Sequence, residues 1–359
     1  MAKIELRNIW HSYDNDDEYA IRNVNITFED GSAIALLGPS GCGKTTILSL
    51  VTGLLKPTRG QVLFDGVDVT NLSPKERHIA LVFQFPVLYE SMNVYGNLAF
   101  PLVNDGIDKP KIKQRVKEVA QIMGISHLLK NSSKSLTPAD KQRVALGRGI
   151  VRPNTTAVLL DEPLTVIDPK AQWGLRRNLK EVQRNLKMTM IYVTHDQHEA
   201  LTFAENVVIM NAGEVVQMGT PKQLHEKPEN IFVGYFIGSP GMNILDCEYD
   251  EKNTFSFENN SFSVTDELKA QLKDHGKHIT VGIRPEYLEI YATEQKTAMP
   301  GEVTIVDDVA AYKIITVKIG NVEIKGRVSE AIELEEGAHA WIRLPQEHLM
   351  FYKNGKNIL

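Results

Sequence analysis

Three short stretches built on consecutive apolar residues stand out in the first two-thirds of the chain. They read AIALLG (33–38), AVLLDE (157–162) and MIYVTHD (190–196). Apolar runs without alternation are typical of central parallel strands that helices cover on both faces. A longer stretch with a more helical pattern, from roughly 94 to 150, separates the first run from the second. The pattern therefore predicts an α/β core, with a helical subdomain at about 85–150.

The pattern changes near residue 238. The segments SFSVTD, HITVGIRP, EVTIVDD, KIITVKIGNVEIKGRV and HAWIRL alternate polar and apolar positions and are separated by turn residues. Alternation of this kind predicts a small antiparallel sheet or barrel, with a hairpin at Gly320-Asn321. We place the boundary within GYFIGSPGMN, which gives an N-terminal domain of residues 1–237 and a C-terminal domain of residues 238–359.

The stretch GPSGCGKTT, residues 38–46, predicts a phosphate-binding loop. It fits G-x-x-x-x-G-K-[ST] and lies between an apolar strand pattern and a helical pattern, the context that this motif requires. Glycines let backbone N–H groups turn inward toward an anion at a helix N-terminus. Lys44 then reaches the β- and γ-phosphates of a nucleotide, and the Thr45 hydroxyl can hold Mg²⁺. The candidate ATP-binding residues are Gly38, Pro39, Ser40, Gly41, Cys42, Gly43, Lys44, Thr45 and Thr46.

Polar side chains at the ends of other predicted strands extend this site. Asp161 can join Thr45 in the Mg²⁺ shell, Glu162 can polarise the attacking water, and Gln84 can contact both metal and water. His195 can hydrogen-bond the γ-phosphate, and Tyr13 offers an aromatic face on which adenine can stack. Taken singly, each has a plainer interpretation, as a solvated acid or a packed side chain. The candidate catalytic residues are Glu162, His195 and Gln84, and the candidate metal ligands are Thr45, Gln84 and Asp161.

The order of these motifs resembles that of the ATPase subunits of ABC transporters, in particular the sugar and polyol importer branch. The likeness spans nearly the whole chain, through GPSGCGKTT, VFQFPVLYESMNVYGNLAFPL, QRVALGRGIVR, VLLDEP, IYVTHDQHEA, GSPGMN and GIRPE. It implies a P-loop NTPase fold with a RecA-like core, an antiparallel β subdomain and a helical subdomain, followed by a small OB- or MOP-like β-barrel domain. It also implies an adenine-stacking Tyr13, a Q-loop Gln84, a D-loop Asp168 and a switch His195, with ATP and Mg²⁺ as cofactors.

In that family two subunits sandwich two ATP molecules, each between the cradle of one subunit and an LSGGQ signature from the other. This chain has Leu136, Thr137, Pro138, Ala139 and Asp140 in that place. Thr137 suits an N-cap and Pro138 the first helical position, while Asp140 sits where a capping acid reaches back. Asp140 also brings a negative charge toward a triphosphate, a repulsion of roughly 3 kcal/mol per unit charge at ~5 Å and an effective dielectric of ~20. We therefore predict a degenerate signature.

The degenerate signature favours a heterodimer, in which a second ATPase subunit donates a complete signature to the ATP bound on this chain. The alternatives are a homodimer that tolerates a poor signature, with Mg²⁺ offsetting Asp140, and a regulatory subunit that does not hydrolyse ATP. A soluble P-loop kinase is a further alternative, which the Q-loop and histidine motifs disfavour. We expect a helix of a membrane permease subunit to dock near Phe85, Tyr89 and Met92, with core packing as the plainer interpretation.

Composition limits the partners and the compartment. The chain has 40 Lys and Arg against 45 Asp and Glu, a mild acidity that disfavours nucleic-acid binding through bulk charge. Two cysteines, Cys42 and Cys247, imply no disulfide framework and favour a reducing compartment. The first twenty residues have no signal-peptide pattern, and no apolar run approaches the ~20 residues of a membrane span. We expect a peripheral subunit on the cytoplasmic face of the cell membrane, held there by two permease subunits that receive a solute from a solute-binding protein.

Overall fold

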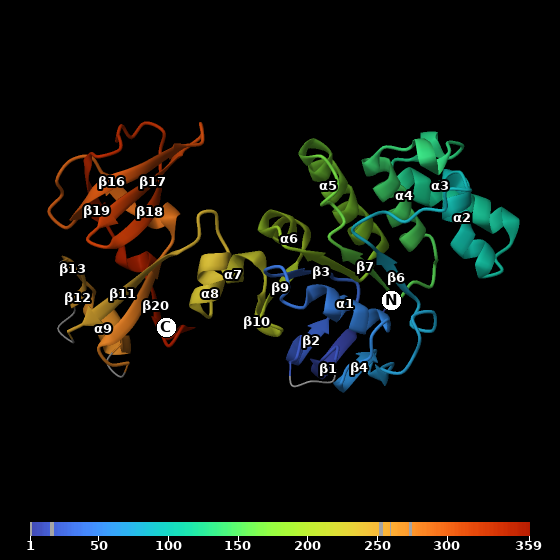
Figure 1. The fold of residues 1–359 in the computed structure, drawn as a ribbon, viewed down its shortest axis with the longest axis horizontal. Coiled ribbons are helices and arrows are strands. Elements are labelled where there is room, and N and C mark those ends of the chain that lie inside the picture. Colours follow the sequence, from blue (N-terminus) through green and yellow to red (C-terminus); the bar gives the residue numbers. More distant parts are fainter. Residues whose placement is uncertain (1, 15–17, 251–253, 259, 273–274) are drawn as a thin grey trace. The chain divides into compact units, whose positions relative to one another are not determined.

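The computed structural model describes every residue except 1, 15–17, 251–253, 259 and 273–274, and divides into two compact units (Figure 1). The first unit is Met1–Pro221 and the second is Lys222–Leu359. Each unit has its own sheets and its own hydrophobic core. Among the described residues, no helix combines the length and the apolar character that a membrane span requires.

The first unit is built around a six-stranded sheet in which five neighbouring strands are parallel and an edge strand is antiparallel. The strand order is β10 (Glu214–Gly219), β9 (Asn206–Asn211), β3 (Ala33–Leu37), β8 (Met190–Thr194), β7 (Ala157–Asp161) and β6 (Ile79–Val82). The three apolar runs of the sequence form β3, β7 and β8, and every residue of β3 and β8 is buried. This confirms the predicted α/β core. Because these strands are parallel, the segments that follow them all begin at one edge of the sheet.

A second, four-stranded antiparallel sheet completes the first unit. Its order is β2 (Ile21–Phe28), β1 (Ile4–His11), β4 (Arg59–Phe64) and β5 (Val67–Asp68). Helix α1 (Lys44–Thr52) buries Ile47, Leu50 and Val51 in a core that contains residues of both sheets. The C-terminal carbonyls of α1 are capped by the buried Arg77, whose guanidinium donates to Leu50 O at 2.7 Å and Val51 O at 2.9 Å. Helix α1 is thus fixed at its far end, which holds its N-terminus in place.

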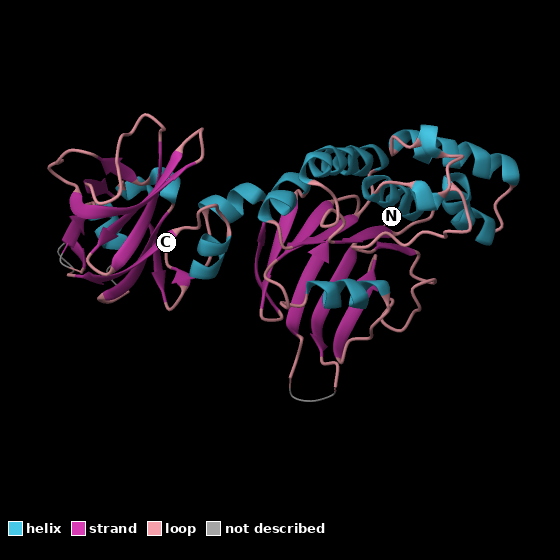
Figure 2. Cartoon of the chain, turned by 45° about the horizontal axis from the view of Figure 1, so that its top comes forward, coloured by secondary structure: helices cyan, strands magenta, loops and turns pink. Residues whose placement is uncertain are grey.

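The remaining helices of the first unit, cyan in Figure 2, form two groups along the sequence. Helices α5 (Pro169–Leu186) and α6 (Gln197–Phe203) follow β7 and β8, and α5 buries Leu175, Leu179 and Val182 at helical spacing. The chain between β6 and β7 forms the other group, α2 (Val94–Asn104), α3 (Lys109–Ile122) and α4 (Pro138–Ile150), with short 3₁₀ turns η1 (Ser126–Leu128) and η2 (Ser133–Ser135). The helical pattern of the sequence between 94 and 150 corresponds to this group.

The second unit contains two antiparallel sheets around one core. The six-stranded sheet has the order β13 (Asn260–Ser263), β12 (Thr254–Phe257), β11 (Asn243–Tyr249), β14 (His278–Ile283), β20 (Met350–Lys353) and β21 (Lys356–Asn357). The five-stranded sheet has the order β15 (Glu289–Tyr291), β19 (His339–Arg343), β16 (Met299–Asp308), β17 (Lys313–Ile319) and β18 (Val322–Val328). The short helices are α7 (Pro221–Glu226), α8 (Ile231–Phe236), α9 (Asp266–Leu272), η3 (Pro285–Tyr287) and η4 (Gln346–His348).

The five-stranded sheet curls on itself and is joined to the other sheet. A Cβ on Gly326 of β18 would lie 2.5 Å from Ile290 Cδ1 of β15, so the two edge strands approach closely. The Asn243 side-chain amide of β11 both donates to Lys325 O and accepts from Lys325 N of β18, each at 2.8 Å. Strands β17 and β18 pair up to Ile319 and Val322, which confirms the hairpin predicted at Gly320-Asn321.

The compact division of the chain falls at Pro221, earlier than the boundary at residue 237 that the change in sequence pattern indicates. The difference has a physical cause in α7 and α8, which are fastened to the second unit. Buried Arg284 donates to the carbonyls of His225, Gly234 and Ile237, three positions within or beside these helices. The change in sequence pattern marks where the strands of the second unit begin. The tertiary contacts also assign α7 and α8, which precede these strands, to the second unit.

Candidate nucleotide-binding site

The predicted phosphate cradle forms the loop between β3 and the N-terminus of α1. Gly38 leaves no room for a side chain, because a Cβ there would lie 2.3 Å from Met210 O. Gly43 caps α1 with φ +100°, a left-handed conformation that favours glycine. Lys44 is only 6% exposed, and its Nζ donates to Gly38 O at 2.8 Å and Pro39 O at 2.9 Å. The loop therefore curls around the Lys44 ammonium at the N-terminus of α1, and a positive charge at a helix N-terminus favours phosphate binding.

Tyr13 lies beside the cradle and is bonded to it. The Tyr13 ring is 61% exposed, and its hydroxyl lies 2.9 Å from Thr46 Oγ1 on α1. The ring of His11 packs edge-on against Tyr13 with centroids 4.9 Å apart. Tyr13 and Gly41 both line a cavity of about 400 Å³. An exposed aromatic face and the phosphate loop thus share one cavity. The hydrogen bond between Tyr13 and Thr46 could not be predicted from the sequence pattern.

Two side-chain oxygens that the sequence predicts as metal ligands meet at the edge of the central sheet. Thr45 Oγ1, at the start of α1, donates to Asp161 Oδ1 at the end of β7 over 3.4 Å. Burial raises the pKa of Asp161, while the Thr45 hydrogen bond and the Lys44 charge act in the opposite direction. A hydroxyl and a desolvated carboxylate suit a hard divalent cation, because the cation restores the charged form of the acid. The structure thus brings together Thr45 and Asp161 as predicted for a metal site.

Glu162 and His195 also lie in direct contact. His195 Nδ1, after β8, is 3.1 Å from Glu162 Oε1, after β7, and the Glu162 N–H donates to Val193 O at 2.9 Å. Glu162 has a φ of +44°, a left-handed conformation that non-glycine residues adopt at a cost, and such strain is concentrated at functional sites. Thr165 Oγ1 donates to the other carboxylate oxygen at 3.3 Å. The carboxylate is thereby oriented between a histidine and a hydroxyl.

A buried acid behind His195 was missed by sequence reasoning. Glu199 of α6 accepts hydrogen bonds from Thr194 Oγ1 at 2.7 Å and from Tyr192 OH at 3.0 Å, both on β8. Burial raises the pKa of Glu199, and these two hydrogen bonds act in the opposite direction. The acid anchors the end of β8 immediately before His195. Its position in a polar helical stretch gave no signal of this role.

Two other predicted residues stand apart from this cluster. Gln84 follows β6 and is half-buried, and its side chain has no hydrogen bond to the described part of the chain. Asp168 is the N-cap of α5, where its Oδ1 accepts from Ala171 N at 3.1 Å. The structure therefore places Gln84 at the same sheet edge without joining it to Thr45 or Asp161, and gives Asp168 a local capping contact.

The start of α4 confirms the predicted helix cap. Thr137 is the N-cap, its Oγ1 accepts from Asp140 N at 3.2 Å, and Pro138 is at the first helical position. The Thr137 hydroxyl also donates to Asp140 Oδ2 at 2.7 Å, and Arg143 lies 3.4 Å from Asp140 Oδ1. Lys141 N donates to Thr137 O. Of the described amides in this first turn, only that of Ala139 is left without a partner.

The segment that follows β6 exposes a row of apolar side chains. Phe83, Phe85, Val87 and Tyr89 are 49%, 67%, 58% and 43% exposed, whereas Met92 is half-buried. Phe83 and Val87 also line a cavity of about 170 Å³ beside Arg148. Of the predicted docking residues, Phe85 and Tyr89 are therefore exposed and Met92 is less so. Phe83 and Val87 belong to the same exposed row, and their alternation with Phe85 and Tyr89 is visible in the sequence.

Comparison with known proteins gives a consistent result along the whole chain. Residues 21–165 match the family described as ABC transporter, and residues 238–288 match the family described as MalK OB fold domain. The trehalose/maltose import ATP-binding protein MalK of Thermococcus litoralis is 38% identical over 93% of this chain and 95% of that protein. This chain belongs to the ABC transporter family.

Further matches agree with this assignment of the chain as an ABC ATPase. The sn-glycerol-3-phosphate import ATP-binding protein UgpC of Yersinia enterocolitica is 36% identical over 98% of this chain and 97% of that protein. Among solved structures, cbiO1 of Clostridium perfringens, part of the ABC transporter complex cbiONQ, has a TM-score of 0.58 and 29% identity over 62% of this chain and 89% of its own. A dimeric ATP-binding cassette in a post-hydrolysis state with ADP and Pi has a TM-score of 0.54 and 27% identity over 61% of this chain and 98% of its own. The P-loop fold and the C-terminal OB-like domain are therefore confirmed, together with ATP binding by the family.

Proposed function

We propose that this ABC ATPase is the ATP-hydrolysing subunit of a membrane importer for a carbohydrate or polyol, glycerol or a related compound included. Full-length similarity to import ATP-binding proteins for trehalose/maltose and for sn-glycerol-3-phosphate supports this solute class. The observation that carries the hydrolytic role is the Glu162–His195 pair beside the cradle. The chain acts at the cytoplasmic face of the membrane, held by two permease subunits that receive the solute from a solute-binding protein.

ATP binds with its phosphates in the 38–46 loop and its base on Tyr13. Lys44 and the backbone N–H groups at the start of α1 hold the β- and γ-phosphates. Thr45, Asp161 and Gln84 would hold Mg²⁺, which when bound neutralises charge on the phosphate oxygens. The oxygen chemistry of Thr45 and Asp161 supports this assignment, and Gln84 at the same sheet edge supplies an amide oxygen.

Glu162 orients the attacking water and accepts a proton from it as the bond to the γ-phosphorus forms and ADP leaves. His195 contacts the γ-phosphate on its other side. Because a carboxylate only accepts hydrogen bonds, the His195 Nδ1 that faces Glu162 carries a proton.

The Glu162→Gln substitution tests whether this subunit is a motor. We expect ATP binding to persist while hydrolysis falls by about 100-fold or more, the usual worth of a positioned base. Solute transport by the assembled importer should be lost in parallel. The exposed Glu214→Gln on β10 is the matched control and should leave both rates unchanged. Transport at the normal rate with Glu162→Gln would favour a regulatory subunit that does not hydrolyse ATP.

We further propose that the chain pairs with a different ATPase subunit. The start of α4 supports this proposal. The Thr137 hydroxyl and the Asp140 amide are bonded to each other, and Pro138 has no N–H. Only one amide of the first turn, that of Ala139, is therefore left for a nucleotide across the interface. The better cap is worth about 1 kcal/mol to the helix. Asp140 adds charge repulsion toward phosphate, which its contact with Arg143 only partly offsets. The partner would supply a complete signature to the ATP on this chain, while the partner's own ATP meets the weak helix start.

Turnover by purified subunits tests this asymmetry against a homodimer that tolerates the signature. We expect slow hydrolysis by the chain alone, and an increase of about tenfold or more when Pro138→Gly and Asp140→Gln reopen the helix start, because a donor to the γ-phosphate is worth roughly 1.5–3 kcal/mol. The matched control is the same change at another helix start, Pro110→Gly with Asp108→Gln on α3.

Two results would remove the asymmetric interpretation. One is fast, cooperative hydrolysis by the unaltered chain alone. The other is a rate that the double substitution at Pro138 and Asp140 leaves unchanged.

The exposed row Phe83, Phe85, Val87 and Tyr89 supports a docking surface for a permease helix. Aromatic anchors beside a small cavity are typical of helix-in-groove binding. Tyr89 also packs on Phe100 with centroids 4.5 Å apart and lies 5.3 Å from the Arg148 guanidinium. The neighbouring α4 begins with the signature, so a helix docked here would lie close to the element that faces the second nucleotide.

A charged substitution at Tyr89 separates docking from catalysis. We expect Tyr89→Asp to leave hydrolysis by the isolated subunits within about twofold, while transport by the assembled importer falls by about tenfold or more, since interface anchors are worth ~2 kcal/mol or more. Val67→Asp, at a 65% exposed apolar residue of β5, is the control and should leave transport unchanged. Equal loss of hydrolysis and transport in the Tyr89 variant would count against docking.

A further inference from the structure

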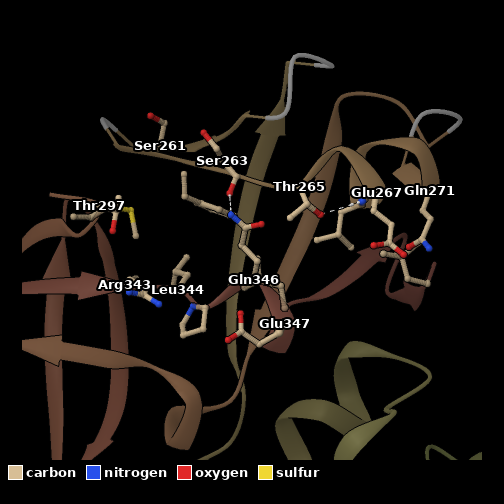
Figure 3. A pocket seen from close by; sticks show the side chains of 16 residues that line it. Ser261, Ser263, Thr265, Glu267, Gln271, Thr297, Arg343, Leu344, Gln346 and Glu347 are labelled. Atoms are coloured by element: carbon tan, nitrogen blue, oxygen red, sulfur yellow. Dashed lines mark hydrogen bonds between the residues drawn. The ribbon is translucent and has the colours of Figure 1, made fainter. Parts of the chain in front are cut away.

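The second unit contains a cavity of about 880 Å³ that belongs to neither the nucleotide site nor the exposed row after β6. Its polar wall comes from β13, α9, η4 and the end of β19, as Figure 3 shows. This volume lies within the range of roughly 300–1,000 Å³ that small-molecule sites occupy. The cavity is therefore large enough for a ligand and lies wholly within one compact unit.

The wall of this cavity carries exposed hydrogen-bonding side chains that are open to a ligand. Those without a side-chain hydrogen bond or ion pair to any described residue are Ser261, Glu267, Gln271, Thr297 and Glu347. Hydroxyls and the amide both donate and accept, whereas the ionised carboxylates only accept. Their chemistry is mixed, and a ligand with several hydroxyl groups matches a mixed set of donors and acceptors.

The side chain of Gln346 is held in the cavity wall by a hydrogen bond. Its Nε2 donates to Ser263 O at 2.6 Å, which holds the amide in one orientation (Figure 3). Its Oε1 is removed from solvent and has no hydrogen-bond partner among the described residues. A buried acceptor left without a donor is destabilising. A ligand that supplies a hydroxyl or an N–H to this oxygen would remove that destabilisation.

The charged side chains that line the cavity indicate which ligands it can bind. Arg343 is the one cation among the described lining residues, and it is paired with Glu289 at 3.1 Å. Glu267 and Glu347 have no such partner, so phosphate and carboxylate groups are disfavoured. The lining also includes the buried apolar residues Met299 and Leu344. Apolar residues together with hydroxyls, amides and carboxylates fit a small molecule that has both C–H surface and hydroxyl groups.

We propose that this cavity binds an uncharged polyhydroxylated molecule, of the size range from a polyol to a disaccharide. The two carboxylates accept hydrogen bonds from ligand hydroxyls, and charge-assisted bonds of this kind are the stronger ones. Gln346 Oε1 accepts a further hydroxyl. The site is independent of ATP, because none of its lining residues belongs to the first unit. It also stands whether or not the proposed solute class of the importer is correct.

Calorimetric titration of the full-length chain tests this site. The probes are glycerol, xylitol, glucose and maltose, with inorganic phosphate and choline as charged comparators. We expect one saturable site per chain for at least one uncharged probe. Glu347→Gln and Gln346→Leu should each weaken it by about tenfold, equivalent to about 1.4 kcal/mol. Glu323→Gln, exposed on β18 outside the cavity, is the matched control and should bind normally, as should Lys44→Ala at the nucleotide loop.

Three outcomes would overturn the proposal. The first is no saturable binding of any uncharged probe by a folded chain. The second is binding that only phosphate or choline shows. The third is uncharged-probe binding that neither Glu347→Gln nor Gln346→Leu weakens. Because Glu347 is exposed, its substitution should leave the fold intact, so a lost signal there reports on the cavity itself.

Discussion

The parallel pairing of β3, β7 and β8 is the constraint on which the rest of the first unit depends. Their apolar runs can be buried on both faces only when they lie side by side, and parallel pairing brings their following segments to one edge. Through that arrangement the cradle, the Asp161-Glu162 pair and His195 come within hydrogen-bonding distance, although more than 30 residues separate each from the next. Arg77 secures the other end of α1, so the helix start stays at this edge.

The sequence predicts the parts of the molecule that depend on local pattern. The apolar runs locate β3, β7 and β8, the glycines locate the phosphate loop, and the residues from Thr137 to Asp140 locate a helix start. Contacts between distant segments lie beyond such patterns. The Tyr13–Thr46 bond and the burial of Glu199 behind His195 depend on how β1, α1, β8 and α6 pack, so periodicity carries no signal of them. The division of the chain at Pro221 likewise depends on contacts that cross the change in pattern, among them the hydrogen bonds of buried Arg284.

The two helix starts of this nucleotide machinery differ in how far they satisfy their own N–H groups. Helix α1 begins after Gly43, with no side-chain cap and no acid in its first turn. At the start of α4, the hydroxyl, the carboxylate and an amide bond to one another. A helix start that is capped by its own side chains has lost most of its capacity to bind an anion. This contrast within one chain is the physical basis for proposing unequal sites in the assembled ATPase.

The most direct measurement is a high-resolution structure of the closed, ATP-bound complex, assembled with the Glu162→Gln variant so that the nucleotide persists. The account predicts that the Asp140 amide remains on the Thr137 hydroxyl, so that no γ-phosphate oxygen lies within hydrogen-bonding distance of Asp140 N. An Asp140 amide bonded to the terminal phosphate of a nucleotide across the interface would contradict it.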